Sequence, residues 1–262
     1  MRKNGFLAVI FLILIICVAF AAYLFNRNYV VPILMYHSVC PNPDPQNKLA
    51  LSPEVFELQM SFLKEYNKVI TLEELAASIR ENKPIPANAV VITFDDGYAD
   101  NYRYAFPVLK KYNFSAAIFL IVNEVGRPQN DRLSWKEIEE MQASGLITFG
   151  SHCLGPEPLV NISSGSELRK QISDSKKILE EKLGKKVAAF SYPEGKFNQR
   201  IRQQVIAAGY TLAVATNPGK EFPDKDRFVL KRLRISSNAK NLFIFWVETS
   251  GYYNFMRENR HR

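Results

Sequence analysis

Short apolar segments alternate with helical segments along most of this chain, and this order limits the possible folds more than any other feature. The apolar segments are rich in Val, Ile, Ala and Phe and lie at residues 31–36, 89–94, 115–122, 146–150, 187–192 and 211–216. The clearest helical segment between them covers residues 167–183. Alternation of this kind predicts an α/β protein with a largely parallel sheet, either open or closed into a barrel.

Capping residues indicate where several of the predicted helices begin. A Ser-Pro-Glu sequence at residues 52–54 fits a helix start, because proline is favoured at the first helical position. Thr71 with Glu74, and Ser134 with Glu137, have the spacing of capping boxes. No internal repeat or low-complexity segment interrupts the pattern. The length suits one large globular domain or two small ones.

The N-terminus is a predicted targeting segment. A basic Arg-Lys pair precedes an uncharged apolar run at residues 6–25, which is long enough to cross a bilayer. Residues 19–21 (Ala-Phe-Ala) satisfy a cleavage rule, but the apolar run continues beyond them, which favours an uncleaved anchor. We therefore expect a signal-anchor or signal peptide at 1–28 and one domain at 29–262, extracytoplasmic and membrane-anchored, or secreted if the segment is cleaved.

Composition excludes several classes of protein. The chain has 262 residues, of which 47% are hydrophobic and 23% charged, so it can bury a sizeable core and is not disordered. Its formal charge of +8 comes from scattered basic residues, which argues against a nucleic-acid partner and for a solvated surface facing an anionic cell envelope. Three cysteines do not make a disulfide scaffold, and Cys40 and Cys153 are either free thiols or one bridge.

Polar residues follow four of the apolar segments, at the point where each predicted strand ends. The carboxyl ends of parallel strands form the active sites of barrel enzymes. We therefore expect these polar residues to share one site. They are Asp95 and Asp96, Ser151 and His152, Pro193 to Gly195, and Thr216 with Asn217.

Asp95 and Asp96 place two carboxylates side by side, directly after a hydrophobic strand. Like charges this close raise each other's pKa unless a cation neutralises one of them or a reaction uses the strain. A simple Asp-Gly turn is the alternative. His37 and His152 both follow apolar segments, and an aspartate with an imidazole begins a divalent-metal site, although each histidine could instead be structural.

The motif at residues 93–97, TFDDG, resembles the TFDDG motif of the polysaccharide deacetylases, also known as the NodB-homology domain or carbohydrate esterase family 4. PILMYHSV at 32–39, FSYPEGKFN at 190–198 and VLKRLRIS at 229–236 resemble the branch that acts on extracellular N-acetylglucosamine polymers. The resemblance extends over about residues 30 to 235. It implies a distorted, incomplete (β/α) barrel of NodB-homology type behind the N-terminal membrane segment.

The resemblance also implies roles for the polar residues. Asp95 corresponds to the general base that takes a proton from the attacking water, and Asp96 and His152 correspond to metal ligands. His37 corresponds to the general acid toward the leaving amine. Arg232 corresponds to an arginine that orients the base. One carboxylate would then be neutralised by the metal while its neighbour stays ionised.

A further set of residues corresponds to the family's substrate groove. Tyr192, Pro193 and Gly195 would line it, with the Tyr192 backbone amide helping to hold the oxyanion. Trp135 corresponds either to an aromatic wall of the groove or to a core residue at the start of a helix.

The chain departs from the family pattern after His152. A second histidine is expected four or five residues later, where this chain has Pro156 and Glu157. Glu157 could supply the third metal ligand, or the metal site could be lost. The expected cofactor is a divalent metal, zinc first, with cobalt, manganese, nickel or iron as alternatives.

Three functions remain open at the level of sequence. The first is metal-dependent removal of N-acetyl groups from a cell-surface polysaccharide that contains N-acetylglucosamine. The second is a degenerate deacetylase fold that binds glycan without turnover, and the third is a membrane-anchored structural partner.

Overall fold

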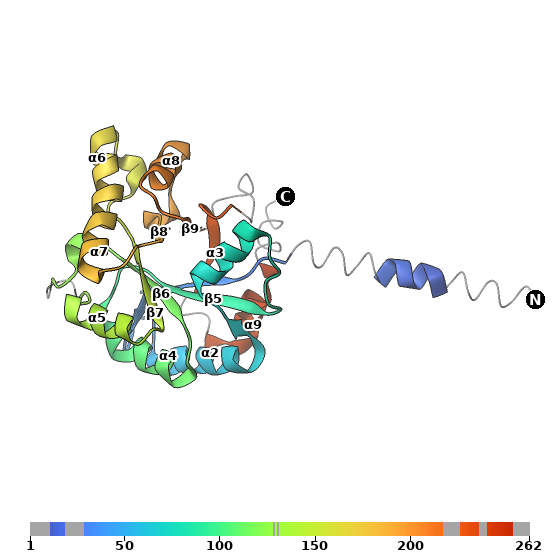
Figure 1. Ribbon diagram of the computed structural model, residues 1–262. Helices are drawn as coiled ribbons and strands as arrows, with labels where there is room; N and C mark the ends of the chain where they lie inside the picture. The colour runs from blue at the N-terminus through green and yellow to red at the C-terminus, as the bar shows by residue number, and fades with distance from the viewer. Residues whose placement is uncertain are drawn as a thin grey trace, which may run out of the picture.

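The computed structural model describes residues 11–18, 29–127, 129, 131–216, 226–235 and 240–253. From residue 33 onward, strands and helices alternate along the chain (Figure 1). The strands are β1 (Ile33–Tyr36), β2 (Ser38–Val39), β3 (Ala50–Leu51), β4 (Lys68–Val69), β5 (Ala89–Phe94), β6 (Ala116–Leu120), β7 (Ile147–Ser151), β8 (Ala189–Ser191), β9 (Leu212–Thr216) and β10 (Leu230–Arg234). The helices are α2 (Pro53–Tyr66), α3 (Leu72–Glu81), α4 (Phe106–Tyr112), α5 (Trp135–Ala143), α6 (Gly165–Arg169), α7 (Ser175–Leu183), α8 (Gln199–Ala207) and α9 (Leu242–Thr249).

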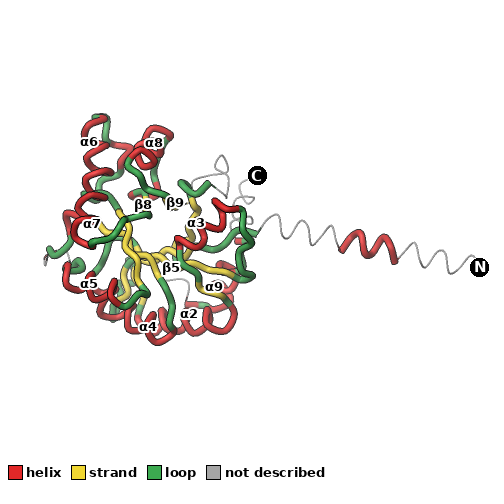
Figure 2. The backbone as a smooth tube through the Cα atoms, in the orientation of Figure 1, coloured by secondary structure: helices red, strands yellow, loops and turns green. Residues whose placement is uncertain are grey.

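The main sheet closes into a barrel of parallel strands. Its order is β1-β10-β9-β8-β7-β6-β5-β4, and β1 also pairs with β5, so seven strands form a ring and β4 extends β5 outside it. Leu34 is in register with Leu233 of β10 on one side and with Ile92 of β5 on the other. Figure 2 shows the strands at the centre with helices around them. The predicted (β/α) barrel is therefore confirmed, with a ring of seven strands.

The strands are buried because both of their faces are covered, as parallel sheets require. All six residues of β5 are buried. Outside the ring, α2 turns Phe56, Met60 and Leu63 inward at helical spacing. Each such apolar side chain stabilises the fold by about 1.5–3 kcal/mol relative to an exposed one.

The helix starts and the long helical segment match the sequence pattern. Both predicted capping boxes are present, at Thr71 and at Ser134. The predicted helix at 167–183 is found as α6 and α7, joined by the π-helical turn Lys170–Asp174.

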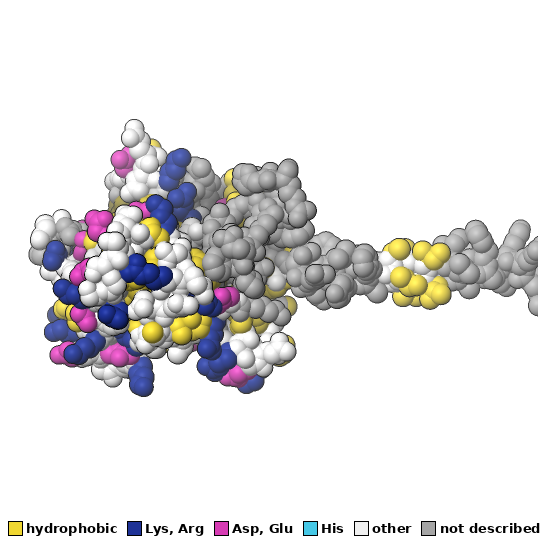
Figure 3. Space-filling model, turned by 90° about the horizontal axis from the view of Figure 1, so that it is seen from above, with side chains coloured by type: hydrophobic (Ala, Val, Ile, Leu, Met, Phe, Trp, Pro, Cys, Tyr) yellow, Lys and Arg dark blue, Asp and Glu magenta, His cyan; other side chains and the backbone are white. Residues whose placement is uncertain are grey.

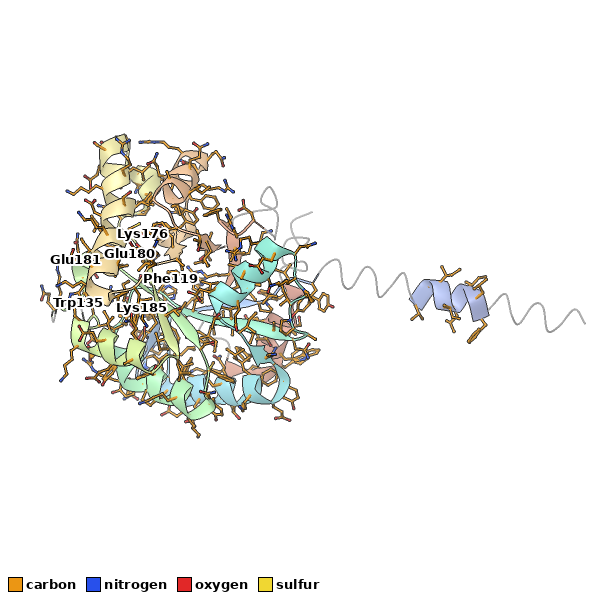
Figure 4. The ribbon with its side chains drawn as sticks, viewed as in Figure 1. Phe119, Trp135, Lys176, Glu180, Glu181 and Lys185 are labelled. Atoms are coloured by element: carbon orange, nitrogen blue, oxygen red, sulfur yellow. The ribbon has the colours of Figure 1, made fainter. Side chains whose placement is uncertain are left out.

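Polar contacts fix α7 against the strand that follows it. Lys176 pairs with Glu180 at 3.2 Å and donates through Nζ to the Val187 carbonyl. Glu180 in turn accepts a hydrogen bond from the Val187 amide at 3.0 Å. Figure 4 labels Lys176 and Glu180 on α7, beside the barrel. The pair therefore fixes the backbone that leads into β8.

The domain begins at the amino ends of the strands. The Val30 amide donates to the Gly251 carbonyl at 2.9 Å, and the Tyr29 and Tyr252 rings meet edge to face at 5.8 Å. Gly251 has a φ of +82°, and a Cβ there would lie 2.2 Å from Cε2 of Tyr29. The start of the domain is thus joined to the C-terminal end of α9.

Part of the predicted targeting segment is described. Residues 11–18 form a helix with exposed, mostly hydrophobic side chains (Figure 3). Among the residues that the structure describes, none of the helices has the length and apolar character needed to cross a bilayer. The rest of the predicted run at 6–25 lies outside the described residues.

Candidate active site

One cleft collects polar side chains from the carboxyl ends of the barrel strands. Its volume is about 390 Å³. Strands β1, β5, β7, β8, β9 and β10 all contribute residues at or just beyond their ends. The lining includes His37, Asp95, Asp96, Arg132, His152, Pro156, Pro193, Glu194, Gly195, Thr216 and Arg234.

A tight turn after β5 separates the two aspartates. Asp96 and Gly97 both have left-handed backbone conformations, with φ of +70° and +64°. A Cβ at residue 97 would lie 2.6 Å from Cδ2 of Leu120, so any other residue would both strain the backbone and displace the Leu120 side chain. A non-glycine residue in this conformation costs about 1–2 kcal/mol, and such strain is concentrated at functional sites. The turn directs the Asp95 and Asp96 side chains to different partners.

Asp95 is bound by Arg232 inside the barrel. The two terminal nitrogens of Arg232 donate to the two carboxylate oxygens of Asp95 at 2.7 and 2.6 Å. Both side chains are almost completely buried, and Arg232 also donates to the Ser191 hydroxyl at 2.8 Å. The Arg232 guanidinium lies over the Phe119 ring, with Cζ 5.5 Å from its centroid. Phe119 is labelled in Figure 4, in the barrel interior.

This pairing decides the charge of Asp95. Burial raises the pKa of the carboxyl, but the Arg232 charge, followed by His152, the Arg232 hydrogen bonds and His37, outweighs burial and lowers the pKa to about 2. Asp95 is therefore ionised at every physiological pH. Breaking a buried pair of this kind costs about 3–5 kcal/mol.

Asp96 faces His152 across the cleft. The Asp96 Oδ1 to His152 Nε2 distance is 3.6 Å. Nδ1 of His152 lies 2.9 Å from the Ser191 carbonyl oxygen. Because a carbonyl only accepts, Nδ1 carries a proton. The nitrogen that faces Asp96 is therefore Nε2, which carries the lone pair in this tautomer of the neutral imidazole.

The Asp96 and His152 pair fits two ligands of a divalent metal. Ligands at about 2.0–2.2 Å from a metal lie about 3–3.5 Å from each other, close to the observed separation. A ligating histidine normally donates its other ring N–H to a carbonyl or carboxylate, as His152 does to Ser191. Within the described ranges, however, His, Cys, Asp and Glu side chains form no group of three placed to hold an ion.

His37 lies in the same cleft, directly after β1. Burial lowers the pKa of its imidazole, while Asp95 and Asp96 oppose that effect and Arg232 and His152 add to it. Its Nδ1 is buried and has no hydrogen-bond partner among the residues described. Asn101 holds the backbone here by donating to the His37 carbonyl at 2.8 Å. The imidazole is thus mainly neutral at pH 7 and able to exchange a proton.

Glu157 is not brought to the metal-ligand pair. Its side chain is exposed, and it is absent from the described lining of the cleft, whereas Pro156 belongs to that lining. The turn at 155–157 therefore directs the Pro156 ring toward the site and the Glu157 carboxylate away from it.

The groove residues are placed in two ways. Pro193 and Gly195 line the cleft. Gly195 has a φ of +68°, and a Cβ at this position would lie only 2.7 Å from the Thr216 amide nitrogen. The predicted oxyanion role of the Tyr192 amide is wrong, because this amide donates to the Val214 carbonyl at 3.1 Å. The Tyr192 side chain is buried, and its hydroxyl donates to the Phe228 carbonyl.

Trp135 lies away from the cleft. It starts α5, packs against the hydrophobic core, and has Nζ of Lys182 5.8 Å from its ring centroid. Figure 4 shows it on the side of the molecule formed by α5 and α7. Of the two sequence interpretations, the core position agrees with this placement and the groove wall does not.

The sequence interpretation missed Ser191, which is buried beneath the cleft, and Arg132, which lines it. Ser191 links both halves of the site, since its hydroxyl accepts from Arg232 and its carbonyl contacts His152. Its position at the end of β8 was the available signal. Arg132 stacks on Tyr98, with Cζ 4.0 Å from the ring centroid, and donates to Glu124 at 2.9 Å. No motif indicated it.

Cys40 and Cys153 are free thiols in the structure. Cys153 is a core residue that directly follows His152, and its burial raises the pKa of the thiol well above its usual range.

Comparisons with known proteins agree with this geometry. Residues 82–213 match the polysaccharide deacetylase family. The poly-beta-1,6-N-acetyl-D-glucosamine N-deacetylase of Staphylococcus epidermidis is 31% identical over 205 residues, which cover 72% of this chain and 69% of that protein. The Streptococcus pyogenes deacetylase PplD, solved in complex with acetate, matches with a TM-score of 0.73 and 29% identity over 82% of this chain and 97% of that one. IcaB from Ammonifex degensii matches with a TM-score of 0.73 and 26% identity over 86% and 97% of the two chains. From sequence and fold alike, the chain belongs to the polysaccharide deacetylases.

Proposed function

We propose that this protein hydrolyses N-acetyl groups on a polysaccharide that contains N-acetylglucosamine, with a divalent metal as cofactor. The observation that supports this most directly is that the two adjacent aspartates have different partners. Asp95 is held ionised by Arg232, and Asp96 faces Nε2 of His152, whose Nδ1 contacts the Ser191 carbonyl, in the same cleft. A glycan-binding cleft without turnover would need neither arrangement.

The reaction adds water across the acetamide and gives acetate and a free amine. Asp95 accepts a proton from the attacking water as its oxygen bonds to the carbonyl carbon. His37 takes up a proton from solvent to form its imidazolium, the minor form at pH 7, and delivers that proton to the nitrogen as the C–N bond breaks. A carboxylate with a pKa of about 2 is a weak base, so Asp95 acts by position and charge more than by basicity.

Asp96 and His152 would hold the metal, with zinc as the first candidate and cobalt, manganese, nickel or iron as alternatives. A divalent ion supplies Lewis-acid chemistry when bound, because it polarises a carbonyl and lowers the pKa of water. Ser191 keeps the His152 imidazole in the tautomer that this role needs.

The proposed substrate class is a linear polymer with exposed acetamido groups. Relatives of this chain include enzymes named for poly-beta-1,6-N-acetyl-D-glucosamine. The cleft is open at the barrel mouth and bordered by Pro193, Glu194 and Gly195, which suits a sugar within a chain.

The proposed location is the outer side of the cytoplasmic membrane, with residues 6–25 as anchor. The apolar run and the basic pair before it support this placement. If the run is removed by cleavage, the same domain would be secreted.

The test is acetate release by the full-length protein in detergent. The substrates are oligomers of poly-β-1,6-linked and β-1,4-linked N-acetylglucosamine, and the protein is assayed after metal removal and after reloading with zinc, cobalt or manganese. Metal-dependent acetate release is the expected result. Glycan binding without acetate release under every metal would replace this proposal with the degenerate alternative.

A further inference from the structure

The first six residues of helix α9 are apolar on every side of the helix, and only Glu248 and Thr249 at its end are polar, yet three of those six apolar residues are exposed. Its first six residues, 242–247, are all large and apolar. Among them only Phe245 is fully buried, whereas Phe243 is 67% and Trp246 52% exposed. A helix that is hydrophobic on all sides is expected to be covered on all sides. Something outside the described domain should therefore cover the exposed half.

Helix α2 extends this apolar surface. Leu58 and Tyr66 are about half exposed, and together with Phe62, Leu242 and Trp246 they line a shallow groove between the two helices. Seven large apolar side chains are exposed in the described part of 29–253. Five of them form what we name the α9 face: Leu58, Tyr66, Phe243, Ile244 and Trp246. The other two, Val160 and Ile206, lie elsewhere on the surface.

The chain entry point restricts where the α9 face can lie. Val30 is hydrogen-bonded to Gly251 just beyond the end of α9, and Tyr29 packs on Gly251 and Tyr252. The four residues from the end of the apolar run at 25 to residue 29 span at most about 14 Å. Helix α9, with eight residues, is about 12 Å long. If residues 6–25 cross a bilayer, the exposed residues of α9 must lie within about two helix lengths of its surface.

We infer that the α9 face binds the lipid–water interface of the membrane that holds the anchor. This inference rests on the membrane anchoring proposed above. Trp, Tyr and Phe are the side chains that favour the interface, and they make up three of the five members of the α9 face. A helix bound in this way lies in the plane of the interface with its apolar side turned toward the acyl chains.

This contact would fix the orientation of the barrel. Helix α9 follows β10, whose carboxyl end borders the cleft, and ends at Thr249, two residues before Gly251, which is bonded to Val30 near the amino end of β1. The helix therefore runs roughly along the strands, in the opposite direction. With α9 flat on the membrane, the cleft opens sideways along the lipid surface, not straight away from it.

The two tryptophans of the chain provide a matched test. Trp246 belongs to the α9 face, and Trp135 starts α5, on the other side of the barrel in Figures 1 and 4. The full-length chain is reconstituted into vesicles of phosphatidylcholine and phosphatidylglycerol whose acyl chains carry bromine near the headgroup. Trp135→Phe leaves Trp246 as the reporter, and Trp246→Phe leaves Trp135.

Bromine should quench Trp246 at least about threefold more than Trp135, because only an interfacial side chain reaches the acyl chains. In the Trp135→Phe background, Phe243→Ser with Ile244→Ser should remove most of that quenching. Acetate release, measured in parallel in detergent, reports on catalysis alone.

Three results would overturn the inference. If the protein floats with the vesicles but the two tryptophans are quenched equally, the anchor is supported and the contact of the α9 face with the membrane is contradicted. If the protein does not float, the membrane anchoring is contradicted as well. A Trp246 emission shift that depends on protein concentration in detergent, without quenching in vesicles, assigns the face to a second copy of the chain.

Discussion

Arg232 donates to both carboxylate oxygens of Asp95 through its two terminal nitrogens, so the last strand of the barrel holds the first aspartate of the site. Asp95 has no comparable contact with His152, which faces Asp96 instead. The two neighbouring carboxylates are thus separated into two environments by one left-handed turn. This separation is the basis of the first two predictions.

Asp95→Asn should lower acetate release at least about a hundredfold, the usual effect of losing a group that moves a proton in the transition state. It should also lower the free energy of unfolding by about 3 kcal/mol, because Arg232 would keep its buried charge without a counter-ion. Acetate release and thermal unfolding measure the two effects.

Asp226→Asn is the matched control for that variant. Asp226 also accepts two hydrogen bonds from an arginine, Arg202, at 3.1 and 2.8 Å, but it lies outside the described lining of the cleft. It should lose stability and keep activity. Full activity in Asp95→Asn would remove Asp95 from the reaction.

His152→Ala should abolish binding of one equivalent of zinc or cobalt, since it removes one of the two facing ligands. Glu157→Ala should leave metal content unchanged, because the Glu157 side chain is exposed and outside the cleft lining. Elemental analysis after reloading gives both results. Equal metal loss in the two variants would return Glu157 to the coordination shell.

Pro156→His should tighten metal binding on the order of tenfold or more, because it adds an imidazole at a position that lines the cleft. Glu157→His is the matched control and should change the metal affinity little, because Pro156 lines the cleft and residue 157 does not. Competition with a chromogenic chelator measures both affinities. A larger gain at residue 157 would show that the turn is oriented differently when metal is bound.

Glu248→Gln should stabilise the protein above neutral pH. Burial raises the pKa of Glu248 to about 7, and its buried Oε2 has no hydrogen-bond partner among the described residues. Between the unfolded pKa of about 4.5 and the folded pKa of about 7, the folded state binds the extra proton, so stability falls as pH rises through this window.

The gain from Glu248→Gln should reach about 1–2 kcal/mol at pH 8 and vanish near pH 4, since a partly exposed carboxyl retains some hydration. Urea unfolding at the two pH values measures it. A pH-independent difference between the variant and the parent would contradict the proposed ionisation.

Much of the fold could be predicted because parallel strands that are buried on both faces appear as continuous apolar runs, as β5 does. The cleft residues His37, Asp95, Asp96 and His152 could be predicted because each follows such a run. Helix α9 was not predicted. Its apolar sequence has no clear period, so nothing in it distinguishes an exposed face from a buried one.

Contacts that depend on three-dimensional neighbours could not be read from the sequence. The Tyr192 amide is occupied because β9 lies beside β8 and supplies the Val214 carbonyl. Trp135 turns into the core because α5 packs next to α7, where Lys182 covers the ring. A backbone amide can bind an oxyanion or a neighbouring strand, and a tryptophan can line a groove or pack in a core. In both cases the packing of an element distant in sequence decides between the two.

The pairing of β1 with both β5 and β10 has a consequence for how the chain folds. The β1 and β5 pairing can form once about the first hundred residues are available, but the ring cannot close before residues 230–234 arrive. These same residues include Arg232, the counter-ion of Asp95. A nascent or truncated chain that lacks them has an open sheet edge and an uncompensated carboxylate in its core. Contacts this distant in sequence slow folding, so barrel closure and the assembly of the catalytic centre should be a single late event.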